Sequence, residues 1–469
     1  MTVHTHTQDL TPRARRAAEL EEFARRTAGS RAAHARVDGL IPGGAPGGLL
    51  CFPPDGSPIH LERGTGAYVW DADGNRCLDL VAGDWTMILG HGNAEVDRAI
   101  VDRLSRGTTL CAPDPDLGFE LATLLHERYP SMERMRFTTS GTEAVLFAMR
   151  VARATTGRPK IAKMRGAYHG TYDTALVSNG KFADPAYVVP GLMPGTVQAT
   201  VLLEYNEIPR SIAIIEEHRD ELAAVIVEPV HATTGMVPAD AAYLRALREV
   251  TARSGIVLIF DEVCCLGVST HGAQGTYGVT PDLTTLGKAV GGGLPLGVFG
   301  GSAELMRQVD PWLNRLPGET SQNTAPVRHA STLAGTALNL TVALATVRQL
   351  TPELHAHLDD LGSRLRSGVN AVGARHGLPL RATGAGNLFG LHWTPQPVVD
   401  IRTAQTSRRR VVHELNVFLY NAGHLVMPNG NGIVTAAMTD ADIDGFLADL
   451  DRIATGAGPD GWDAEGGDE

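Results

Sequence analysis

The sequence predicts an α/β protein in which helices flank a mostly parallel central sheet, with a smaller α+β domain beside it. Two stretches, LAAVIVEPV at 222–230 and GIVLIFDEV at 255–263, are nearly continuous runs of apolar residues. Such runs are typical of strands that are buried on both faces of a parallel sheet. Helical stretches separate the strand candidates, and this alternation favours a layered α/β domain. A chain of 469 residues is also long enough to form two lobes around a cleft.

The N-terminal part predicts a helix followed by a hairpin. Residues 12–36 are polar and rich in alanine, as in a helix with a solvated face. Gly and Pro punctuate the next stretch, 40–48. Residues 66–80 then predict a β-hairpin, because the turn-forming sequence DADGN stands between alternating apolar positions.

From about residue 93 the chain alternates between helices and short apolar runs. Strands are also predicted at 134–140 and 159–164, and helices at 144–155 and 239–253. The final residues are rich in Gly, Asp and Glu, which predicts disorder. We therefore expect four parts: an N-terminal segment with the helix and the small-domain hairpin (1–92), a large ligand-binding domain (93–350), a C-terminal small domain (351–453) and a disordered tail (454–469).

Composition argues against several classes of protein. The net charge is −11, from 41 basic and 52 acidic residues, whereas nucleic-acid binders usually carry a clustered basic excess. No stretch approaches the roughly 18 unbroken apolar residues that a membrane span needs. The five cysteines have no zinc-ligand spacing, and their odd number suits a reducing compartment. The N-terminus shows no apolar signal region, so we expect a cytoplasmic protein that binds neither nucleic acid nor membrane.

The sequence FTTSGTEAV places Ser140, Gly141 and Thr142 between a predicted strand and a predicted helix. Backbone N–H groups and the positive end of the helix dipole gather at such a point and favour an anion. Gly141 permits close approach of the backbone, and Thr142 adds a hydroxyl. The same residues also form an ordinary capping box, with Ser140 as the cap and Glu143 three residues later.

Asp261 and Glu262 stand at the carboxyl end of the predicted strand at 255–263, the edge at which open α/β sheets bind ligands. A buried carboxylate there needs a partner, either a positively charged ring nitrogen or an arginine.

Lys288 is one of only four lysines and lies beside a glycine run. In an apolar, dry pocket a lysine loses basicity and becomes a nucleophile that can form a Schiff base. A snorkelling surface lysine is the alternative interpretation.

Tyr168 and His169, in the sequence GAYHGTYD, follow a predicted strand. The aromatic ring can stack on a flat ligand or simply belong to the core. Taken together, an anion-binding turn, an aromatic plate, a buried carboxylate and an uncharged lysine match pyridoxal 5′-phosphate (PLP) group for group. Dinucleotide-binding, Walker A, zinc-protease and nucleophile-elbow motifs are missing from the sequence.

The motifs TTSGTEA, AYHGTYD, VEPV, FDEV, STLAGTALN and GAQGTYGVTPDLTTLGKAVGGGLP resemble those of the class III aminotransferases of PLP fold type I. Within that class, the chain most resembles the glutamate semialdehyde aminomutases and their relatives. The resemblance extends from about residue 41 to 444. It implies a homodimer with shared active sites.

This resemblance also implies roles for individual residues. Lys288 would carry the cofactor as a Schiff base, and Asp261 would hold the pyridine nitrogen protonated. Tyr168 would cover one face of the ring and Val263 the other. The phosphate would be bound by the turn that contains Ser140, Gly141 and Thr142.

Further positions are implied at the edges of the same site. Glu228 matches a position near the 3-oxygen of the ring, and His169 belongs to the same cofactor-binding set. Thr332 matches a threonine that reaches the phosphate across the dimer interface. Trp85 stands where the family lines its substrate pocket.

The chain departs from the aminomutases where they bind substrate. Leu50 falls at the place of an arginine that receives the substrate carboxylate, and the segment VMPNGNGIV is short and has no glutamate. His231 is either a substrate contact or a structural histidine. We therefore expect a PLP-dependent aminotransferase acting on an amino acid or related amine and a carbonyl acceptor. An aminomutase or epimerase with a single substrate, or a non-catalytic paralogue that binds PLP or an amino acid, are the alternatives.

Overall fold

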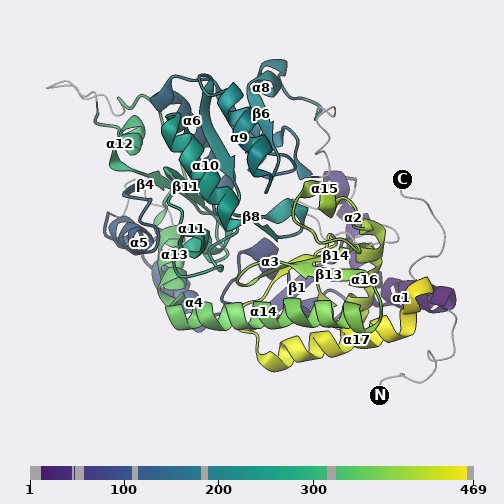
Figure 1. Cartoon of the computed structure of the whole chain (residues 1–469). Helices are drawn as coiled ribbons and strands as arrows, with labels where there is room; N and C mark the ends of the chain where they lie inside the picture. The colour runs from purple at the N-terminus through teal and green to yellow at the C-terminus, as the bar shows by residue number, and fades with distance from the viewer. Residues whose placement is uncertain are drawn as a thin grey trace.

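A seven-stranded sheet forms the centre of the larger unit in the computed structural model of the chain (Figure 1). The structure describes residues 12–37, 39–44, 47, 58–107, 115–180, 189–313 and 324–461. The strands follow the order β4 (Arg134–Thr138), β12 (Gly297–Gly301), β11 (Leu283–Leu286), β10 (Val257–Asp261), β7 (Leu222–Val227), β5 (Lys160–Met164) and β6 (Thr200–Leu203).

Six of these strands run in the same direction. The pairs β10–β11, β10–β7, β5–β7 and β5–β6 are parallel, whereas β12 is antiparallel to both β11 and β4. The predicted fold class, α/β with a mostly parallel central sheet, is confirmed. The strands β6, β11 and β12 were not predicted from the sequence.

Helices cover both faces of this sheet. Along β7 and β10, Val225, Val227 and Leu258 join the apolar cluster that contains α10 (Ala241–Arg253). Their neighbours Ile226 and Ile259 join the cluster that contains α6 (Gly141–Thr156). Successive side chains of a strand point to opposite faces, so two buried faces require the unbroken apolar runs seen in the sequence.

The remaining helices of this unit surround the sheet and its loops. They are α4 (Ala94–Leu104), α5 (Pro115–Arg128), α7 (Asp173–Leu176), α8 (Pro194–Gln198), α9 (Ile208–Glu217), α11 (Gly272–Tyr277), α12 (Ala303–Met306) and α13 (Ala337–Gln349). A small hairpin joins β8 (Val230–His231) to β9 (Val237–Pro238).

The smaller unit combines segments from both ends of the chain. Its four-stranded sheet has the order β1 (Leu61–Thr65), β2 (Tyr68–Asp71), β3 (Arg76–Asp79) and β15 (His424–Leu425), and a three-stranded sheet has the order β13 (Leu380–Thr383), β14 (Leu388–Trp393) and β16 (Asn431–Ile433). β15 pairs in parallel with β3, which ties the C-terminal segment to the N-terminal one. The predicted hairpin is present as β2 and β3.

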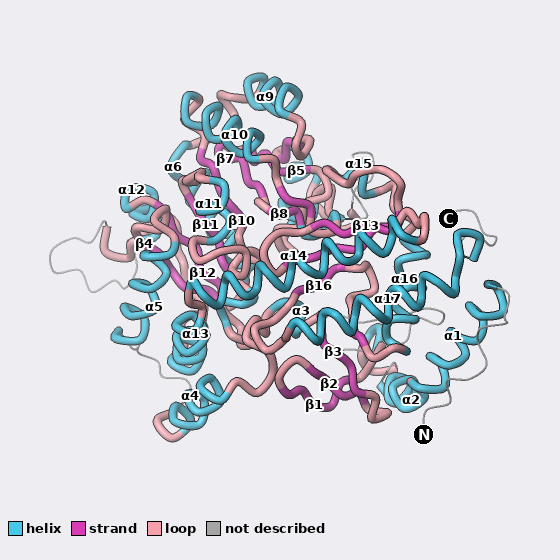
Figure 2. The backbone as a smooth tube through the Cα atoms, turned by 60° about the horizontal axis from the view of Figure 1, so that its bottom comes forward, coloured by secondary structure: helices cyan, strands magenta, loops and turns pink. Residues whose placement is uncertain are grey.

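Long helices lie beside these smaller sheets. α14 (Pro352–Arg375) and α17 (Asp440–Gly461) lie side by side, and α1 (Pro12–Arg26) contacts both α16 (Arg409–Asn421) and α17 (Figures 1 and 2). The other helices are α2 (Ala28–Val37), α3 (Ala82–Trp85) and α15 (Ile401–Ala404). Arg16 on α1 forms an ion pair with Glu414 on α16.

Two details differ from the expected elements. The single helix predicted over 12–36 is two helices, α1 and α2, separated at Thr27. At the other end, α17 continues to Gly461, past position 454, where the sequence predicts an irregular tail to begin. Residues 462–469 lie outside the described residues.

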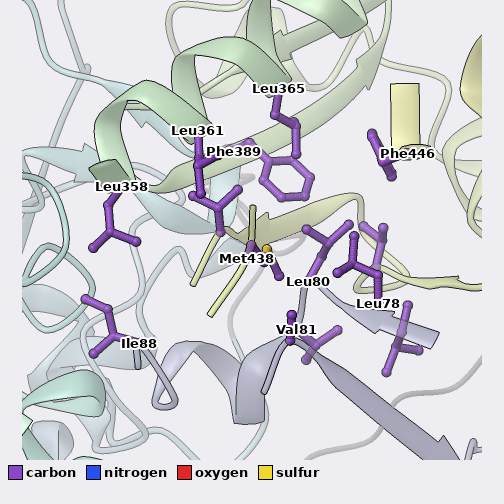
Figure 3. Packing of buried hydrophobic residues seen from close by; sticks show 14 of the residues in the cluster. Leu78, Leu80, Val81, Ile88, Leu358, Leu361, Leu365, Phe389, Met438 and Phe446 are labelled. Carbon is purple, nitrogen blue, oxygen red and sulfur yellow. The ribbon is translucent and has the colours of Figure 1, made fainter. Parts of the chain in front are cut away.

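Apolar side chains from α14, β14, β3 and α17 form one buried cluster beneath α14 (Figure 3). Phe389 on β14 is fully buried there, close to Leu361 and Leu365 of α14. The segment that leads from β3 into α3 packs into this cluster and is thereby held within the smaller unit.

Replacing Phe389 with alanine is expected to lower the free energy of unfolding by about 3–5 kcal/mol, because the surrounding side chains cannot fill the cavity that it leaves. Chemical denaturation followed by circular dichroism measures this loss. The control is Val101→Ala on α4, where the side chain is 65% exposed and the expected change is within about 0.5 kcal/mol. A Phe389→Ala loss no larger than that of the control contradicts the prediction.

Candidate active site

A cavity of about 360 Å³ opens where the parallel strands of the seven-stranded sheet end. The turn after β4 contributes Ser140, and the loop after β5 contributes Tyr168. Glu228 follows β7, Asp261 ends β10, and Lys288 follows β11. The sequence-predicted cofactor residues of five separate strands are therefore brought to one place, as expected for the carboxyl edge of an open α/β sheet.

The turn between β4 and α6 is both a helix cap and part of the cavity. The Ser140 hydroxyl accepts a hydrogen bond from the Glu143 N–H at 3.2 Å. The Glu143 carboxylate accepts the N–H of Thr139 at 2.7 Å and its hydroxyl at 2.5 Å. Gly141 and Thr142, in the first turn of α6, line the cavity. Their backbone N–H groups precede the intrahelical ladder and remain available to an anion.

Packing leaves little room for a side chain at position 141. A Cβ atom there would lie 3.0 Å from both terminal carbons of Val263. Val263 also lies 3.0 Å from the place of a Cβ on Gly287. Val263 thus packs between Gly141, in the turn before α6, and Gly287, which precedes Lys288. The side chain of Val263 forms part of the cavity wall.

The Asp261 carboxylate is 5% exposed and is held by three groups. One oxygen contacts His169 Nδ1 at 2.7 Å, and the other accepts the Val263 N–H at 3.2 Å and the Thr285 hydroxyl at 3.1 Å. Burial lowers the pKa of His169 despite its bond to Asp261. A neutral His169 with its proton on Nδ1 donates to Asp261, so the carboxylate is fixed in orientation while it lines the cavity.

Glu228 supports the loop that carries Tyr168. Its two oxygens accept the backbone N–H groups of Tyr168 at 3.0 Å and Ala232 at 3.1 Å. Burial, with a smaller contribution from Asp261, raises the pKa of Glu228 to about 8. The Tyr168 side chain is 41% exposed and lines the cavity rather than belonging to the core.

Lys163 holds the same loop from below, a function that sequence reasoning missed. Its amine is fully buried and donates to the carbonyl oxygens of Ala167 at 2.9 Å, Ala175 at 2.7 Å and Val177 at 2.8 Å. Burial lowers the pKa of Lys163 to about 7. A lysine inside the apolar strand KIAKM could have indicated this role. A buried amine needs several hydrogen-bond acceptors, and a loop that packs against the strand can supply them.

Lys288 faces an acidic partner that the sequence analysis did not single out. Its Nζ lies 2.9 Å from Asp84 Oδ2, 3.0 Å from the Asp84 carbonyl oxygen and 4.4 Å from the centre of the Trp85 ring. Burial lowers the pKa of Lys288, but Cys264 and Asp84 outweigh burial, so the net pKa lies above its ordinary value. The expected lowering of the pKa of Lys288 is therefore wrong in this structure. The Asp84 carboxylate is close enough to stabilise the ammonium form.

The other predicted residues occupy different places. Trp85 lines the cavity as expected. His231 does not belong to the lining: it is fully buried, with Nε2 3.8 Å from Glu228 Oε1 and its ring 4.9 Å from that of Tyr205. Burial lowers the pKa of His231 to about 3. The structural interpretation of His231 replaces its assignment to the substrate pocket. Leu50 lies outside the described residues.

Thr332 is exposed and lies apart from the cofactor residues of its own chain. It lines a second cavity of about 690 Å³, together with Phe119, Arg136 and His329. This cavity is larger, but its lining contains neither a lysine nor a carboxylate. The smaller cavity is therefore the candidate active site on chemical grounds.

Two features are absent from the described part of the chain: a metal-binding cluster and a membrane-spanning helix. Those residues contain no cluster of three or more His, Cys, Asp or Glu side chains arranged to hold a metal ion. Within the same ranges, none of the helices combines the length and the apolar character required to cross a membrane.

The chain is similar to known proteins over most of its length. The family described as Aminotransferase class-III matches residues 52–453. The chain is 36% identical over 430 residues to glutamate-1-semialdehyde 2,1-aminomutase of Bacillus subtilis (strain 168), covering 90% of this chain and 97% of the relative.

The chain is also similar to solved structures. A transaminase with PLP bound is 32% identical, with a TM-score of 0.83 over 92% of this chain and 97% of its own. A β-phenylalanine aminotransferase from Variovorax paradoxus is 32% identical, with a TM-score of 0.86 over 95% and 98%. These matches, which span most of the sequence, show that the chain belongs to the class III aminotransferases, a family of PLP-dependent enzymes.

Proposed function

We propose that this enzyme is an aminotransferase that moves an amino group from an amine donor to a carbonyl acceptor at the cavity around Lys288. The observation that carries the proposal is the presence of the Lys288 amine and the oriented Asp261 carboxylate in one cavity lining. A lysine that bonds an aldehyde and a carboxylate that pairs with a pyridine nitrogen are the two groups that PLP chemistry requires.

The residues present fit PLP at each of its functional groups. The first turn of α6, at Gly141 and Thr142, offers backbone N–H groups to a phosphate. Gly141 provides a cradle that a Cβ would fill against Val263. The Asp261 carboxylate, fixed by His169 and Thr285, is aimed into the same cavity and suits a protonated ring nitrogen.

The other side chains of the cavity lining would contact different parts of bound PLP or of the donor. Bound PLP supplies an aldehyde and a ring that accepts electrons. Glu228, with its pKa raised to about 8, can present a proton to an anionic ring oxygen. Tyr168 offers an aromatic wall, and Lys288, when its amine is free, exchanges a proton with the amino carbon of the donor. Val263 and Trp85 restrict the space left for water.

The nature of the donor follows from the charges at the mouth of the cavity. Asp84 lies beside the Lys288 amine, near the point at which a donor nitrogen must enter. The described residues of the lining include no arginine that could receive a carboxylate. A carboxylate on the amino carbon of the donor would approach Asp84, and like charges at about 4 Å repel by roughly 1–4 kcal/mol. We propose donors whose amino carbon carries no carboxylate; among the similar structures, the β-phenylalanine aminotransferase acts on such an amine.

An amine shift within one substrate is the second candidate, and it is favoured by the 36% identity to an aminomutase. The two reactions need the same cofactor residues and differ in whether a separate acceptor is consumed. Turnover with one substrate and no added carbonyl compound supports the aminomutase; a strict requirement for an acceptor supports the aminotransferase.

We further propose that two copies share their active sites through Thr332. This residue lines the larger cavity together with Phe119, and Leu333, an exposed apolar residue, follows it in the chain. Phe119 is 76% exposed and Leu333 51% exposed in the single chain. Large exposed apolar side chains of this kind favour contact with another protein surface, and a second copy would bring Thr332 to the phosphate end of the neighbouring cavity.

Lys288→Ala is expected to abolish turnover and the visible absorbance of the enzyme-bound cofactor, because no other amine of the described lining can bond the aldehyde. Borohydride reduction followed by peptide mass spectrometry should place the cofactor on Lys288 in the unaltered enzyme. Lys160→Ala is the matched control, since Lys160 pairs with Glu221 outside the cavity and its loss should leave both signals intact. Retention of both signals in Lys288→Ala contradicts the assignment.

A series of four-carbon donors tests the proposed specificity. We expect 3-aminobutyrate and 2-aminobutane to discharge the bound cofactor at least about tenfold faster than 2-aminobutyrate, because only the last has its carboxylate on the amino carbon. Loss of cofactor absorbance in single turnovers measures the rates. Asp84→Asn should narrow the gap, and a preference for 2-aminobutyrate in the unaltered enzyme would exclude this donor class.

Mixed dimers test the role of Thr332. Lys288→Ala and Thr332→Tyr homodimers should each contain little borohydride-fixed cofactor at limiting PLP. A one-to-one mixture should recover about a quarter of the wild-type cofactor fixed by borohydride, because half of the dimers are mixed and each has one complete site. No recovery on mixing means that Thr332 does not act across an interface.

A further inference from the structure

The segment that presents Asp84 to Lys288 is a left-handed turn. The four residues of α3 have positive φ angles of 46° at Ala82, 63° at Gly83, 58° at Asp84 and 70° at Trp85. Only glycine adopts this region freely, and three of the four residues carry a Cβ that makes it costly. Consecutive strained residues persist only where surrounding contacts enforce them, and they are typical of functional sites.

A buried carboxylate enforces this turn. Asp79, at the end of β3, is 2% exposed. One of its oxygens accepts the N–H groups of Val81 at 3.0 Å and Ala82 at 2.9 Å, while the other contacts His91 Nε2 at 2.7 Å. The Trp85 N–H closes the turn on the Val81 carbonyl at 2.9 Å. Figure 1 shows α3 between the seven-stranded sheet and the smaller sheets.

The strained turn aims three groups at one amine. Asp84 contributes both its carboxylate, at 2.9 Å, and its carbonyl oxygen, at 3.0 Å, and Trp85 contributes the face of its ring, at 4.4 Å. Lys288 itself has a positive φ of 49°. Two strained segments, remote in sequence, thus meet at a single nitrogen atom.

The other titratable groups that face Lys288 come from different elements. Tyr168 follows β5 and Cys264 follows β10, and burial raises the pKa of both side chains. Both therefore remain uncharged at neutral pH. Asp261 and Glu228 line the same cavity but are held by His169 and by backbone N–H groups. Asp84 is thus left as the acidic group paired with the amine, with its Oδ2 2.9 Å from Lys288 Nζ.

We propose that Asp84 is a positioning residue that receives the Lys288 amine whenever this amine is not bonded to the cofactor. The proposal rests on the proposed function, in which the donor displaces Lys288 and frees its amine. Asp84 and the Trp85 ring then hold the freed amine next to the reacting carbon. Asp84 also stabilises the ammonium form after Lys288 has taken a proton, so that the same proton is kept for delivery to the neighbouring carbon.

Competitive acetylation of the full-length enzyme loaded with pyridoxamine phosphate tests this proposal, because that form leaves Lys288 free. Acetic anhydride is the probe, and mass spectrometry compares labelling of Lys288 with labelling of Lys160 over a range of pH. The variants are Asp84→Asn, which tolerates a positive φ as well as Asp does, and Asp84→Glu, which restores the charge. Asp220→Asn is the control, since its side chain is 86% exposed on another surface.

In the unaltered enzyme, Lys288 should titrate to the reactive amine only at high pH. In Asp84→Asn the midpoint of the labelling curve should move to lower pH, and labelling at pH 8 should rise about tenfold, because the charge that stabilised the ammonium is gone. Asp84→Glu should restore part of the shift, and Asp220→Asn should match the unaltered enzyme. A simple gain in access to the probe raises the rate but leaves the midpoint in place.

An unchanged midpoint in Asp84→Asn overturns the proposal, provided that borohydride still fixes PLP to Lys288 in that variant. A failure of the proposed function has a separate signature: the unaltered enzyme then shows no cofactor fixed to Lys288, whatever the labelling curves do. A shifted midpoint together with fixed cofactor supports both.

Discussion

The candidate site depends on the common direction of β4, β5, β7, β10 and β11. Because these strands run parallel, their carboxyl ends lie along one edge of the sheet, and the loops that follow them meet there. Ser140, Tyr168, Glu228, Asp261 and Lys288 each occupy such a position. Antiparallel strands in their place would send alternate loops to the opposite edge. The antiparallel β12 supplies no loop to the site, but fills the gap between β4 and β11.

Three polar side chains at or beneath this edge, Asp261, Glu228 and Lys163, are buried, and each is held by defined partners. Asp261 is oriented by His169, Thr285 and a backbone N–H, and Glu228 by two backbone N–H groups. Lys163 satisfies three carbonyl oxygens beneath the loop of Tyr168. A buried group without a partner destabilises the fold, so these bonds also make the cavity rigid. Among the described residues of the cavity lining, those from the smaller unit are Asp84 and Trp85, which the strained backbone of α3 delivers to the open side.

The sequence analysis named many of the residues that line the cavity around Lys288, but it missed Asp84. Gly141, Asp261 and Lys288 are recognisable because each is an unusual residue at a strand end or glycine run. Asp84 escaped notice because its importance comes from four positive φ angles and from a contact with a residue 204 positions away. The same contact contributes to the raised pKa of Lys288, which is opposite to the expected lowering. His231 was misplaced because a histidine next to VEPV can point toward the ligand or behind Glu228, and only packing distinguishes these.

By itself, the sequence determined the α/β layering, since strands buried on both faces must be apolar throughout and this pattern is visible without coordinates. It also determined the local chemistry of each strand end: a helix start suited to an anion, a carboxylate, a lysine. The tertiary structure alone decided which of these ends share a cavity, which carboxylate meets the lysine and which histidine is buried. These outcomes depend on contacts between residues far apart in the chain, and periodicity or spacing carries no information about such contacts.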